Sequence, residues 1–164
     1  MNIQDHEIFL SIAKDYSRFS KCQFTKVGAI AVNERKRIIA SGVNGTLPGH
    51  PNCCDQHFKH REDHVPFTTE NEIHAEMNMI LDLAKSGTKF RELSIYLTIS
   101  PCAECLKAIL SLTDTSSINT MSVRSIIYSD KYHRTTDDEL NRMIEKARKA
   151  GTTLISIEDL RNQS

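Results

Sequence analysis

Two short segments with cysteine, histidine and glutamate at fixed spacings constrain the fold of this chain more than any other feature. The first reads His74-Ala75-Glu76, and the second, after 24 intervening residues, reads Pro101-Cys102-Ala103-Glu104-Cys105. Imidazole and thiolate groups are ligands that zinc prefers, and three of them leave one tetrahedral position for water. We therefore expect His74, Cys102 and Cys105 to meet at one metal ion, although they come from separate parts of the chain.

The pattern of apolar residues predicts that helices and strands alternate along the chain. The expected helices cover 5–19, 73–85, 103–112 and 137–150, and the expected strands cover 27–32, 38–43, 93–99, 123–128 and 153–157. Helices that alternate with strands pack on both faces of a mixed sheet, which gives a three-layer α/β fold. The length of 164 residues suits a single domain over 1–164.

The stretch 45–72 shows no sustained helical or strand period. A structureless loop of this length is unusual inside a compact domain. The stretch contains prolines, cysteines and histidines rather than an apolar run, so a bound metal could replace a hydrophobic core there. We predict a loop insertion at about 45–72 that zinc stabilises.

Composition excludes several classes of protein. The chain has 21 basic and 21 acidic residues, and a net charge of zero argues against binding to long nucleic acid. Its five cysteines are an odd number and its first residues lack a basic region, so we expect reduced thiols or metal ligands in the cytoplasm rather than a disulfide framework. No stretch approaches the roughly 20 apolar residues of a membrane span.

The order H-x-E…P-C-x-x-C is the signature of zinc deaminases. Each half should begin a helix, whose N-terminus favours the thiolate forms of Cys102 and Cys105. A zinc-bound water becomes hydroxide near neutral pH and can attack C4 of a cytosine ring. Glu76 can reach this water without binding the metal, and it can shuttle protons to the ring and to the leaving amine. Two other interpretations stay open, a redox-active C-x-x-C pair and a catalytically idle zinc module that only binds a partner.

Further segments make the sequence resemble the deoxycytidylate (dCMP) deaminases of the cytidine deaminase superfamily, in particular their bacteriophage branch. These segments are Ser20-Lys21-Cys22, Lys26-Val27-Gly28-Ala29, 41–46, 52–55, 71–76 and 98–102, and the resemblance covers about 5–157. It implies a five-stranded sheet with helices on both faces. It also implies hydrolysis of dCMP to dUMP with release of ammonia, which supplies thymidylate synthesis, in the host cytoplasm if a phage encodes the protein.

The resemblance assigns five positions to substrate binding. Asn44 matches an asparagine that contacts the sugar or the base, although a simple Asn-Gly turn would also explain it. The backbones of Ala75 and Ser100 match positions that hydrogen-bond the pyrimidine. Tyr128 and Tyr132 match a tyrosine-bearing segment beside the pocket, where an aromatic ring can stack on a base. Packing in the core is the alternative for Tyr128.

The resemblance also implies a second, structural zinc site made of Cys22, Cys53, His60 and His64. His60 and His64 are four residues apart, so one helical turn would place both imidazoles on one face. A closed Cys2His2 site would tie the insertion to the rest of the domain and add folding energy. Surface histidines and buried thiols are the alternative, and the rival ligands nearby are Cys54 and His57.

A dCMP deaminase must hold a phosphate, whereas a nucleoside deaminase need not. The chain contains no Walker loop and no G-x-G-x-x-G segment. Basic side chains expected near the pocket mouth are therefore the candidates, namely Lys26, Lys131 and Arg134, and an ordinary solvated surface is the alternative for each. The alternative function is the same zinc-dependent deamination on another substrate. This substrate would be cytidine or deoxycytidine, or a cytosine-containing tRNA or single-stranded DNA.

The resemblance further implies an oligomer, often a homohexamer, that dCTP with Mg²⁺ activates and dTTP inhibits. The segment 42–49 resembles the effector-binding loop, and its candidate contacts are Gly42, Asn44, Gly45, Thr46 and Gly49. Glycines there would allow the backbone to approach phosphates closely. The stretch 112–122 looks inserted relative to the family, and this region often contributes subunit contacts, so the number of subunits stays open.

Overall fold

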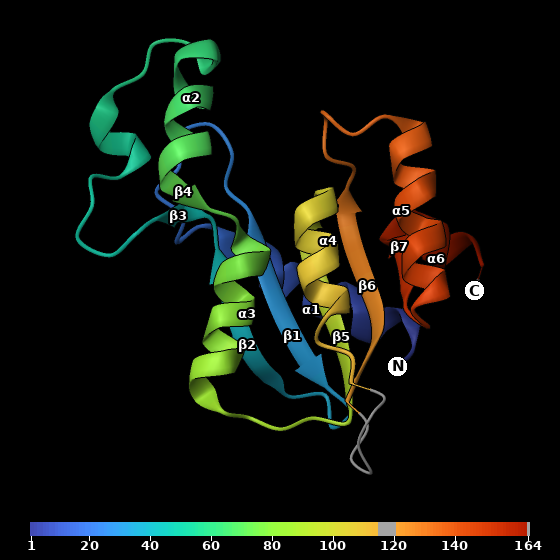
Figure 1. Cartoon of the computed structure of the whole chain (residues 1–164). Helices are drawn as coiled ribbons and strands as arrows, with labels where there is room; N and C mark the ends of the chain where they lie inside the picture. The colour runs from blue at the N-terminus through green and yellow to red at the C-terminus, as the bar shows by residue number, and fades with distance from the viewer. Residues whose placement is uncertain (115–120, 164) are drawn as a thin grey trace.

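A five-stranded mixed sheet forms the centre of the structure, a computed structural model that describes residues 1–114 and 121–163. Its strands follow the order β2-β1-β5-β6-β7 (Figure 1). β1 pairs antiparallel with both β2 and β5, whereas β5, β6 and β7 run parallel. The bounds are β1 Gly28–Asn33, β2 Ile38–Val43, β5 Glu92–Ile99, β6 Ser122–Asp130 and β7 Thr153–Ser156.

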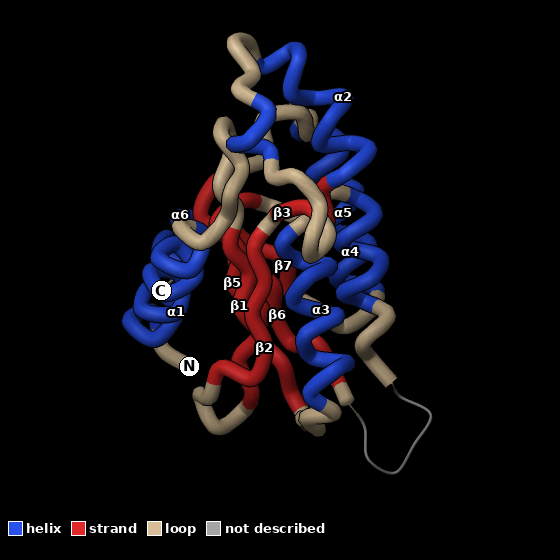
Figure 2. Tube along the Cα trace, turned by 90° about the vertical axis from the view of Figure 1, so that its left-hand side faces the viewer, coloured by secondary structure: helices blue, strands red, loops and turns tan. Residues whose placement is uncertain are grey.

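Helices cover both faces of this sheet (Figure 2). On one face lie α1 (Ile3–Ser17) and α6 (Ile157–Asn162), and on the other lie α3 (Ala75–Ser86), α4 (Ala103–Leu110) and α5 (Asp137–Lys149). α1 contacts β1 and β5, while α3 contacts β2 and α5 contacts β7. The predicted three-layer α/β fold with a five-stranded mixed sheet is therefore confirmed.

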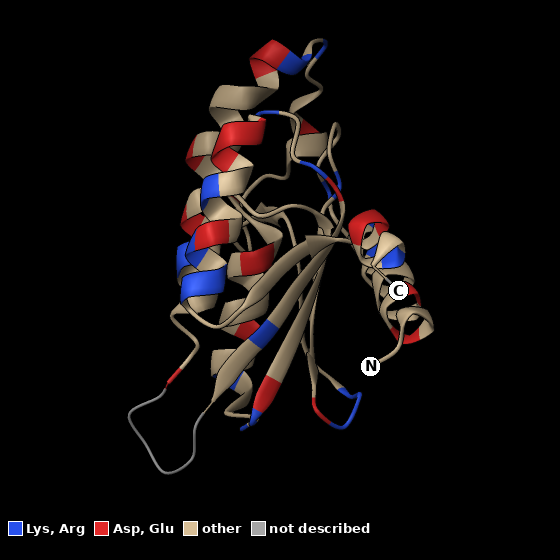
Figure 3. Cartoon of the chain, turned by 90° about the vertical axis from the view of Figure 1, so that its right-hand side faces the viewer, with Lys and Arg blue, Asp and Glu red and all other residues tan. Residues whose placement is uncertain are grey.

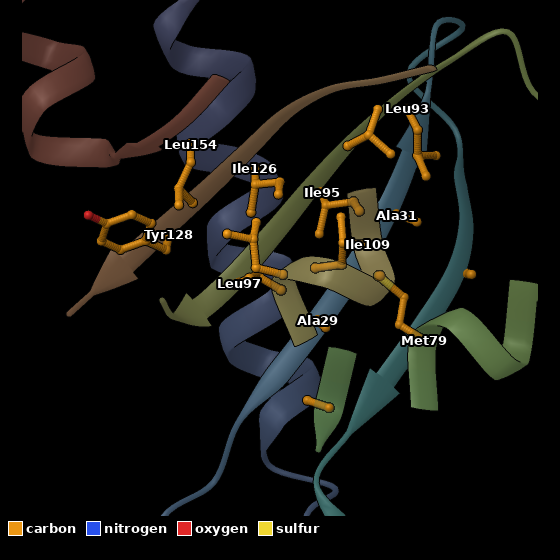
Figure 4. Close-up of a cluster of buried hydrophobic side chains, with 14 of the residues drawn as sticks. Ala29, Ala31, Met79, Leu93, Ile95, Leu97, Ile109, Ile126, Tyr128 and Leu154 are labelled. Carbon is orange, nitrogen blue, oxygen red and sulfur yellow. The ribbon is translucent and has the colours of Figure 1, made fainter. Parts of the chain in front are cut away.

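Each face of the sheet buries its own apolar layer. Figure 4 shows part of the layer under α3, α4 and α5, where Ile95 and Leu97 of β5 lie close to Met79 and Ile109 of the helices. The layer under α1 and α6 contains Phe9, Leu10, Ala13, Ile30, Val32, Tyr96, Ile127 and Ile157. Burial of apolar surface, at about 25 cal/mol per Å², is the main force that holds the helices on the sheet.

Gly42 on β2 determines how closely α3 approaches the sheet. A Cβ atom at Gly42 would lie 2.2 Å from the carbonyl oxygen of Ala75 and 2.4 Å from the backbone nitrogen of Met79. Gly42 is buried under this helix, which argues against the predicted contact with an effector nucleotide. Its missing side chain instead lets the start of α3 pack directly on β2.

The stretch 45–72 contains more regular structure than its sequence pattern predicts. β3 (Gly45–Thr46) pairs antiparallel with β4 (Glu72–Ile73), and between them lie the 3-10 helix η1 (Cys53–Gln56) and the helix α2 (Arg61–Asn71). This insertion extends beyond the end of the main sheet at which α3 begins (Figure 1). The prediction of a loop was wrong because α2 is polar and contains Pro66, and therefore lacks the apolar period of the other helices.

The other predicted helices and strands are present, with bounds that differ by no more than two residues. α1 begins earlier than predicted because Asn2 and Asp5 form a reciprocal capping box. α6 was not predicted, and it begins where the Ser156 side chain accepts a hydrogen bond from the Asp159 N–H. Residues 115–120 of the predicted insertion at 112–122 lie outside the described residues.

Basic and acidic residues are interspersed along the ribbon on the side of the molecule seen in Figure 3, in agreement with the net charge of zero. Ion pairs such as Arg124–Glu92 and Arg148–Glu145 are solvent-exposed, so each contributes little to stability. In the part of the chain that the structure describes, no helix is long and apolar enough to cross a membrane.

Candidate active site

His74, Cys102 and Cys105 lie together where α3 and α4 begin. His74 is the N-cap residue of α3, and Cys102 is the N-cap residue of α4. His74 Nδ1 lies 3.7 Å from Cys102 Sγ and 3.4 Å from Cys105 Sγ. A tetrahedral zinc ion with bonds of about 2.0 Å to nitrogen and about 2.3 Å to sulfur would hold these atoms about 3.5 Å apart. The three residues thus fit one zinc ion and leave its fourth position free.

The protonation of the two thiols also suits a metal cation. Hydrogen bonds from Cys105 and from His74 lower the pKa of Cys102 to about 4, against the opposing effect of burial. The hydrogen bond to Cys102, together with burial, raises the pKa of Cys105. These opposite shifts follow from the hydrogen bond between the two thiols, and a metal ion would displace the proton of that bond.

Glu76 lies in the first turn of α3 and is only 5% exposed. Burial raises the pKa of its carboxyl group to about 7, so this group can take up and release a proton near neutral pH. Glu76 interacts with the charges of His74 and Cys102, but it is not one of the grouped metal ligands. Its position suits proton transfer beside a metal rather than metal binding.

One pocket has His74, Glu76 and Cys102 in its wall. Four of the predicted substrate residues also line it, namely Asn44, Ala75, Ser100 and Tyr132. The backbone N–H of Tyr132 donates to Ser100 Oγ at 2.9 Å, and the N–H of Ser100 donates to the carbonyl oxygen of Asp130 at 2.8 Å. These bonds join the ends of β5 and β6, so the wall is fixed where it borders the metal ligands.

A second group of metal ligands lies beside the same pocket. The ligand atoms of Cys22, Cys53, His64 and Glu72 all lie within 4.8 Å of one another. Cys22 Sγ is 3.2 Å from His64 Nε2 and 3.9 Å from Cys53 Sγ. Glu72 Oε1 is buried without a hydrogen-bond partner among the described residues. Two thiols, an imidazole and this carboxylate oxygen fit a closed zinc site with four protein ligands.

Residues 3–121 match the family model described as the cytidine and deoxycytidylate deaminase zinc-binding region. The chain belongs to this family. It is 30% identical over 159 residues to the deoxycytidylate deaminase of Enterobacteria phage T4, covering 76% of this chain and 77% of that protein. It is also 30% identical over 149 residues to the human (Homo sapiens) deoxycytidylate deaminase, covering 84% of this chain and 72% of that protein.

A solved family member supports the same relationship through its structure. The crystal structure of the dCMP deaminase from the cyanophage S-TIM5, in complex with dCMP and dUMP, is similar with a TM-score of 0.70. The sequence identity is 27%, and the match covers 95% of this chain and 98% of that chain. The predicted membership in the dCMP deaminase branch of the family, with its phage relatives, is therefore confirmed.

His60 does not join the second group of ligands. It is the exposed N-cap residue of α2 and has an extended backbone. The prediction that His60 and His64 share one helical face was therefore wrong. Glu72, at the start of β4, completes the group instead, and the sequence analysis missed it because an isolated glutamate has no ligand spacing of its own. The rival ligands lie outside the group and are exposed, namely Cys54 and His57.

Tyr128 is a core residue rather than part of the pocket wall. It is 3% exposed and lies in the apolar layer near Leu154 (Figure 4). Burial raises the pKa of its hydroxyl group. The structure therefore favours the packing alternative for Tyr128, because its side chain projects from β6 into the layer that α5 covers.

The amide of Asn44 is held by other parts of the protein. Its Oδ1 accepts from the N–H of Val27 at 2.8 Å, and its Nδ2 donates to the carbonyl oxygen of Thr25 at 3.0 Å and to Glu72 Oε2 at 3.3 Å. Asn44 is only 7% exposed. It therefore shapes the pocket wall and connects this wall to the second group of metal ligands.

The basic residues near the pocket differ from those predicted. Lys26 is exposed and does not line the pocket, and Lys131 pairs with Asp137 at 2.6 Å. Arg134 lines the pocket as predicted, together with Arg61 from α2, which the sequence analysis did not select. Arg61 was missed because the pattern placed it in a loop rather than on a helix beside the pocket.

Proposed function

We propose that this protein is a zinc-dependent deaminase that hydrolyses dCMP to dUMP and ammonia. The observation that carries this proposal is the group of His74, Cys102 and Cys105 beside buried Glu76, at a pocket whose wall includes His74, Glu76 and Cys102. The cyanophage enzyme that is similar over nearly the whole chain was solved with dCMP and dUMP, which supports this substrate and product. The reaction would supply dUMP for thymidylate synthesis, in the cytoplasm of the cell in which the protein is made.

The residues of the pocket can perform this hydrolysis. Zinc held by His74, Cys102 and Cys105 would make a water molecule nucleophilic near neutral pH. Glu76 would take a proton from the water as its oxygen bonds to C4 of cytosine, and would pass this proton to N3 of the ring. Glu76 would then carry the proton of the new hydroxyl group on C4 to the exocyclic amine. The amine leaves as ammonia when the C4–N bond breaks and the C4 oxygen becomes a carbonyl oxygen. The backbones of Ala75 and Ser100, with Tyr132, would hold the ring.

We also propose that Cys22, Cys53, His64 and Glu72 hold a structural zinc ion. Burial raises the pKa of Cys53 to about 11 and also raises the pKa of Glu72, so a cation would be needed to keep these groups ionised. Four protein ligands leave no position for water, so the ion would contribute stability rather than chemistry. It would fasten η1 and α2 to the segment before β1.

Nucleotide regulation and a homohexamer remain proposals for this chain. Gly45 and Thr46 form β3, and Gly49 lies in an exposed turn with φ of 83°, so this segment could offer backbone N–H groups to the phosphates of a dCTP–Mg²⁺ effector. dTTP would inhibit by binding another state more tightly. Activity measured against both nucleotides, with sedimentation of the same samples, tests these proposals. Activity that changes with neither nucleotide would contradict the proposed regulation by dCTP and dTTP.

A substrate panel tests the proposed reaction against its alternatives. Zinc-loaded protein is incubated with dCMP, CMP, dCTP, deoxycytidine or a short cytosine-containing oligonucleotide, and ammonia release is followed. We expect the highest kcat/KM for dCMP. A preference for deoxycytidine or for the oligonucleotide would support a nucleoside or nucleic-acid deaminase with the same chemistry.

A further inference from the structure

One face of the helix α2 forms a wall of the pocket at the active site. Residues three or four positions apart on this helix lie on one face, and they line the same pocket as Glu76. At the first residue of α2, Arg61 Nη2 lies 3.3 Å from Nε2 of His133, so this wall extends to the loop after β6. The position of α2 therefore shapes the space in which a nucleotide would bind. The α2 residues in the wall are Arg61, His64, Val65, Thr68 and Thr69.

The helix α2 has few contacts of its own that would keep it in this position. It contains 11 residues, with Pro66 among them, and a helix this short is only marginally stable by itself in water. It packs mainly on β3, β4 and η1 rather than on the main sheet. All residues of α2 belong to the described part of the chain, and His64 is the only buried one among them. The place of this wall thus depends on what holds His64.

His64 connects α2 to the second group of metal ligands. Its Nε2 lies 3.2 Å from Sγ of Cys22, which belongs to the segment before β1 and lies outside the insertion. The His64 ring also packs on the ring of Phe24 from the same segment, with 4.7 Å between the ring centroids. The other members of the group are Cys53 in η1 and Glu72 in β4. His64 is therefore the residue of the group through which a bound ion would hold α2.

We propose that His64 is a positioning residue for the reaction: an ion at the second group holds α2 against the pocket through His64, and its occupancy sets the affinity for the nucleotide. This inference rests on the proposed function and on the proposed second zinc ion, and it gives that ion a role in substrate binding besides stability. Without the ion, α2 would form the wall in only a fraction of the molecules.

This fraction determines how strongly nucleotide binding responds to the ion. The apparent affinity falls in proportion to the fraction of molecules that can bind, so a wall formed in about one molecule in ten would weaken binding about tenfold. The reacting groups would keep their arrangement, because they lie at the starts of α3 and α4. Loss of the ion should therefore raise KM and leave kcat nearly unchanged.

The test removes the second ion through a residue that does not line the pocket. Cys53 belongs to the ligand group and lies outside the pocket wall, so Cys53→Ala is the variant, and its exposed neighbour outside the group supplies the matched control Cys54→Ala. Zinc content, amide hydrogen exchange of α2, calorimetric binding of dUMP and steady-state kinetics with dCMP are measured on the full, zinc-loaded chains. Cys53→Ala should hold about one zinc per chain instead of about two. Its α2 amides should exchange at least about tenfold faster, KM for dCMP and Kd for dUMP should rise at least about tenfold, and kcat should stay within about threefold.

A second variant, His64→Gly, separates the ion from the connection that His64 provides. Added imidazole can take the ligand position in the space that the deleted side chain leaves, but it is not attached to α2. With or without imidazole, the α2 amides should exchange faster than in the wild type, and dUMP should bind at least about tenfold more weakly. The exposed residue His60, at the start of the same helix, supplies the control His60→Gly. If Cys53→Ala does not fold, His64→Gly carries the test.

The inference is overturned if Cys53→Ala keeps both zinc ions, or if it loses one and still binds dUMP as tightly as the wild type. Binding of dUMP by His64→Gly at the wild-type affinity would also overturn it. Recovery of that affinity with imidazole would do the same, because the ion would then act without His64. The expected changes in dUMP binding, found in a protein that releases no ammonia from dCMP, would support the inference and contradict the proposed function alone.

Discussion

The carboxylate of Glu72 accepts a hydrogen bond from Nδ2 of Asn44 at 3.3 Å, and this bond joins the second group of metal ligands to the pocket wall. Glu72 also lies two residues before His74, so β4 leads directly from one group of ligands to the other. Any ion that fixes the Glu72 carboxylate would therefore also fix one wall of the active site. The insertion and the reaction site are structurally connected through this residue.

Glu72→Gln should remove the second metal while leaving the first in place. A neutral amide is a weak zinc ligand, so we expect about one zinc per chain instead of about two. The variant should also unfold at a lower temperature, and its KM for dCMP should rise because Asn44 loses its charged partner. Elemental analysis and thermal unfolding check this, with the exposed Glu70→Gln as the control. Two zinc ions per chain in Glu72→Gln would show that Glu72 is not a ligand.

Glu76→Gln should keep the catalytic zinc but lose turnover. The amide is nearly the same size as the carboxyl group and cannot shuttle protons, so kcat should fall by about 10²–10⁴-fold. Zinc content and steady-state ammonia release are measured on the same preparation, with the exposed Glu104→Gln as the control. A kcat within about threefold of the wild-type value would exclude Glu76 from proton transfer.

Gly42→Ala should destabilise the protein through a clash between β2 and α3. The added methyl group would lie 2.2 Å from the carbonyl oxygen of Ala75, and overpacking of this kind costs about 1–3 kcal/mol. Gly45→Ala is the matched control, because its Cβ would meet nothing within 4 Å. Urea unfolding measures the free energy of unfolding of both variants. Equal stability of the two would contradict the close packing described here.

His6 should make stability fall in mild acid. Burial lowers the pKa of His6 below 6.5, the ordinary value that applies to the unfolded chain, and Nδ1 of His6 lies 2.9 Å from the Tyr96 hydroxyl. The unfolded chain therefore binds a proton more readily, so the contribution of His6 is complete above pH 6.5 and is lost as the pH falls below it. Unfolding free energies between pH 7.5 and 5 should decline less steeply for His6→Gln than for the wild type. Unfolding free energies that decline equally with pH in the wild type and in His6→Gln would rule out this contribution of His6.

The sequence alone predicted the parts of the fold with strong local signals. The apolar period of α3 and α5 and the continuous apolar run of β1 mark these elements, because each buries one face or both. The segments His74-Ala75-Glu76 and Pro101–Cys105 predicted that His74, Cys102 and Cys105 lie together, because each segment begins a helix at the same end of the sheet. α2 lacked such a signal, since it is polar, has few apolar residues and packs mainly on β3, β4 and η1 rather than on the main sheet.

The remaining features of the site depend on contacts between distant segments. Glu72 is one of 21 acidic residues, and only the pairing of β3 with β4 places it beside Cys22 and Cys53. Arg61 likewise reaches the pocket because α2 folds back toward the loop after β6. The spacing of residues along the sequence predicts neither the position of Glu72 beside the two cysteines nor that of Arg61 at the pocket.

Conversion of dCMP by the zinc-loaded protein tests the central claim most directly. Products are followed by proton NMR while ammonia is measured in the same sample, for the wild type and for Glu76→Gln. We predict one dUMP and one ammonia for each dCMP consumed by the wild type, and almost no conversion by the variant. Unchanged dCMP in the presence of fully zinc-loaded wild-type protein would contradict the account.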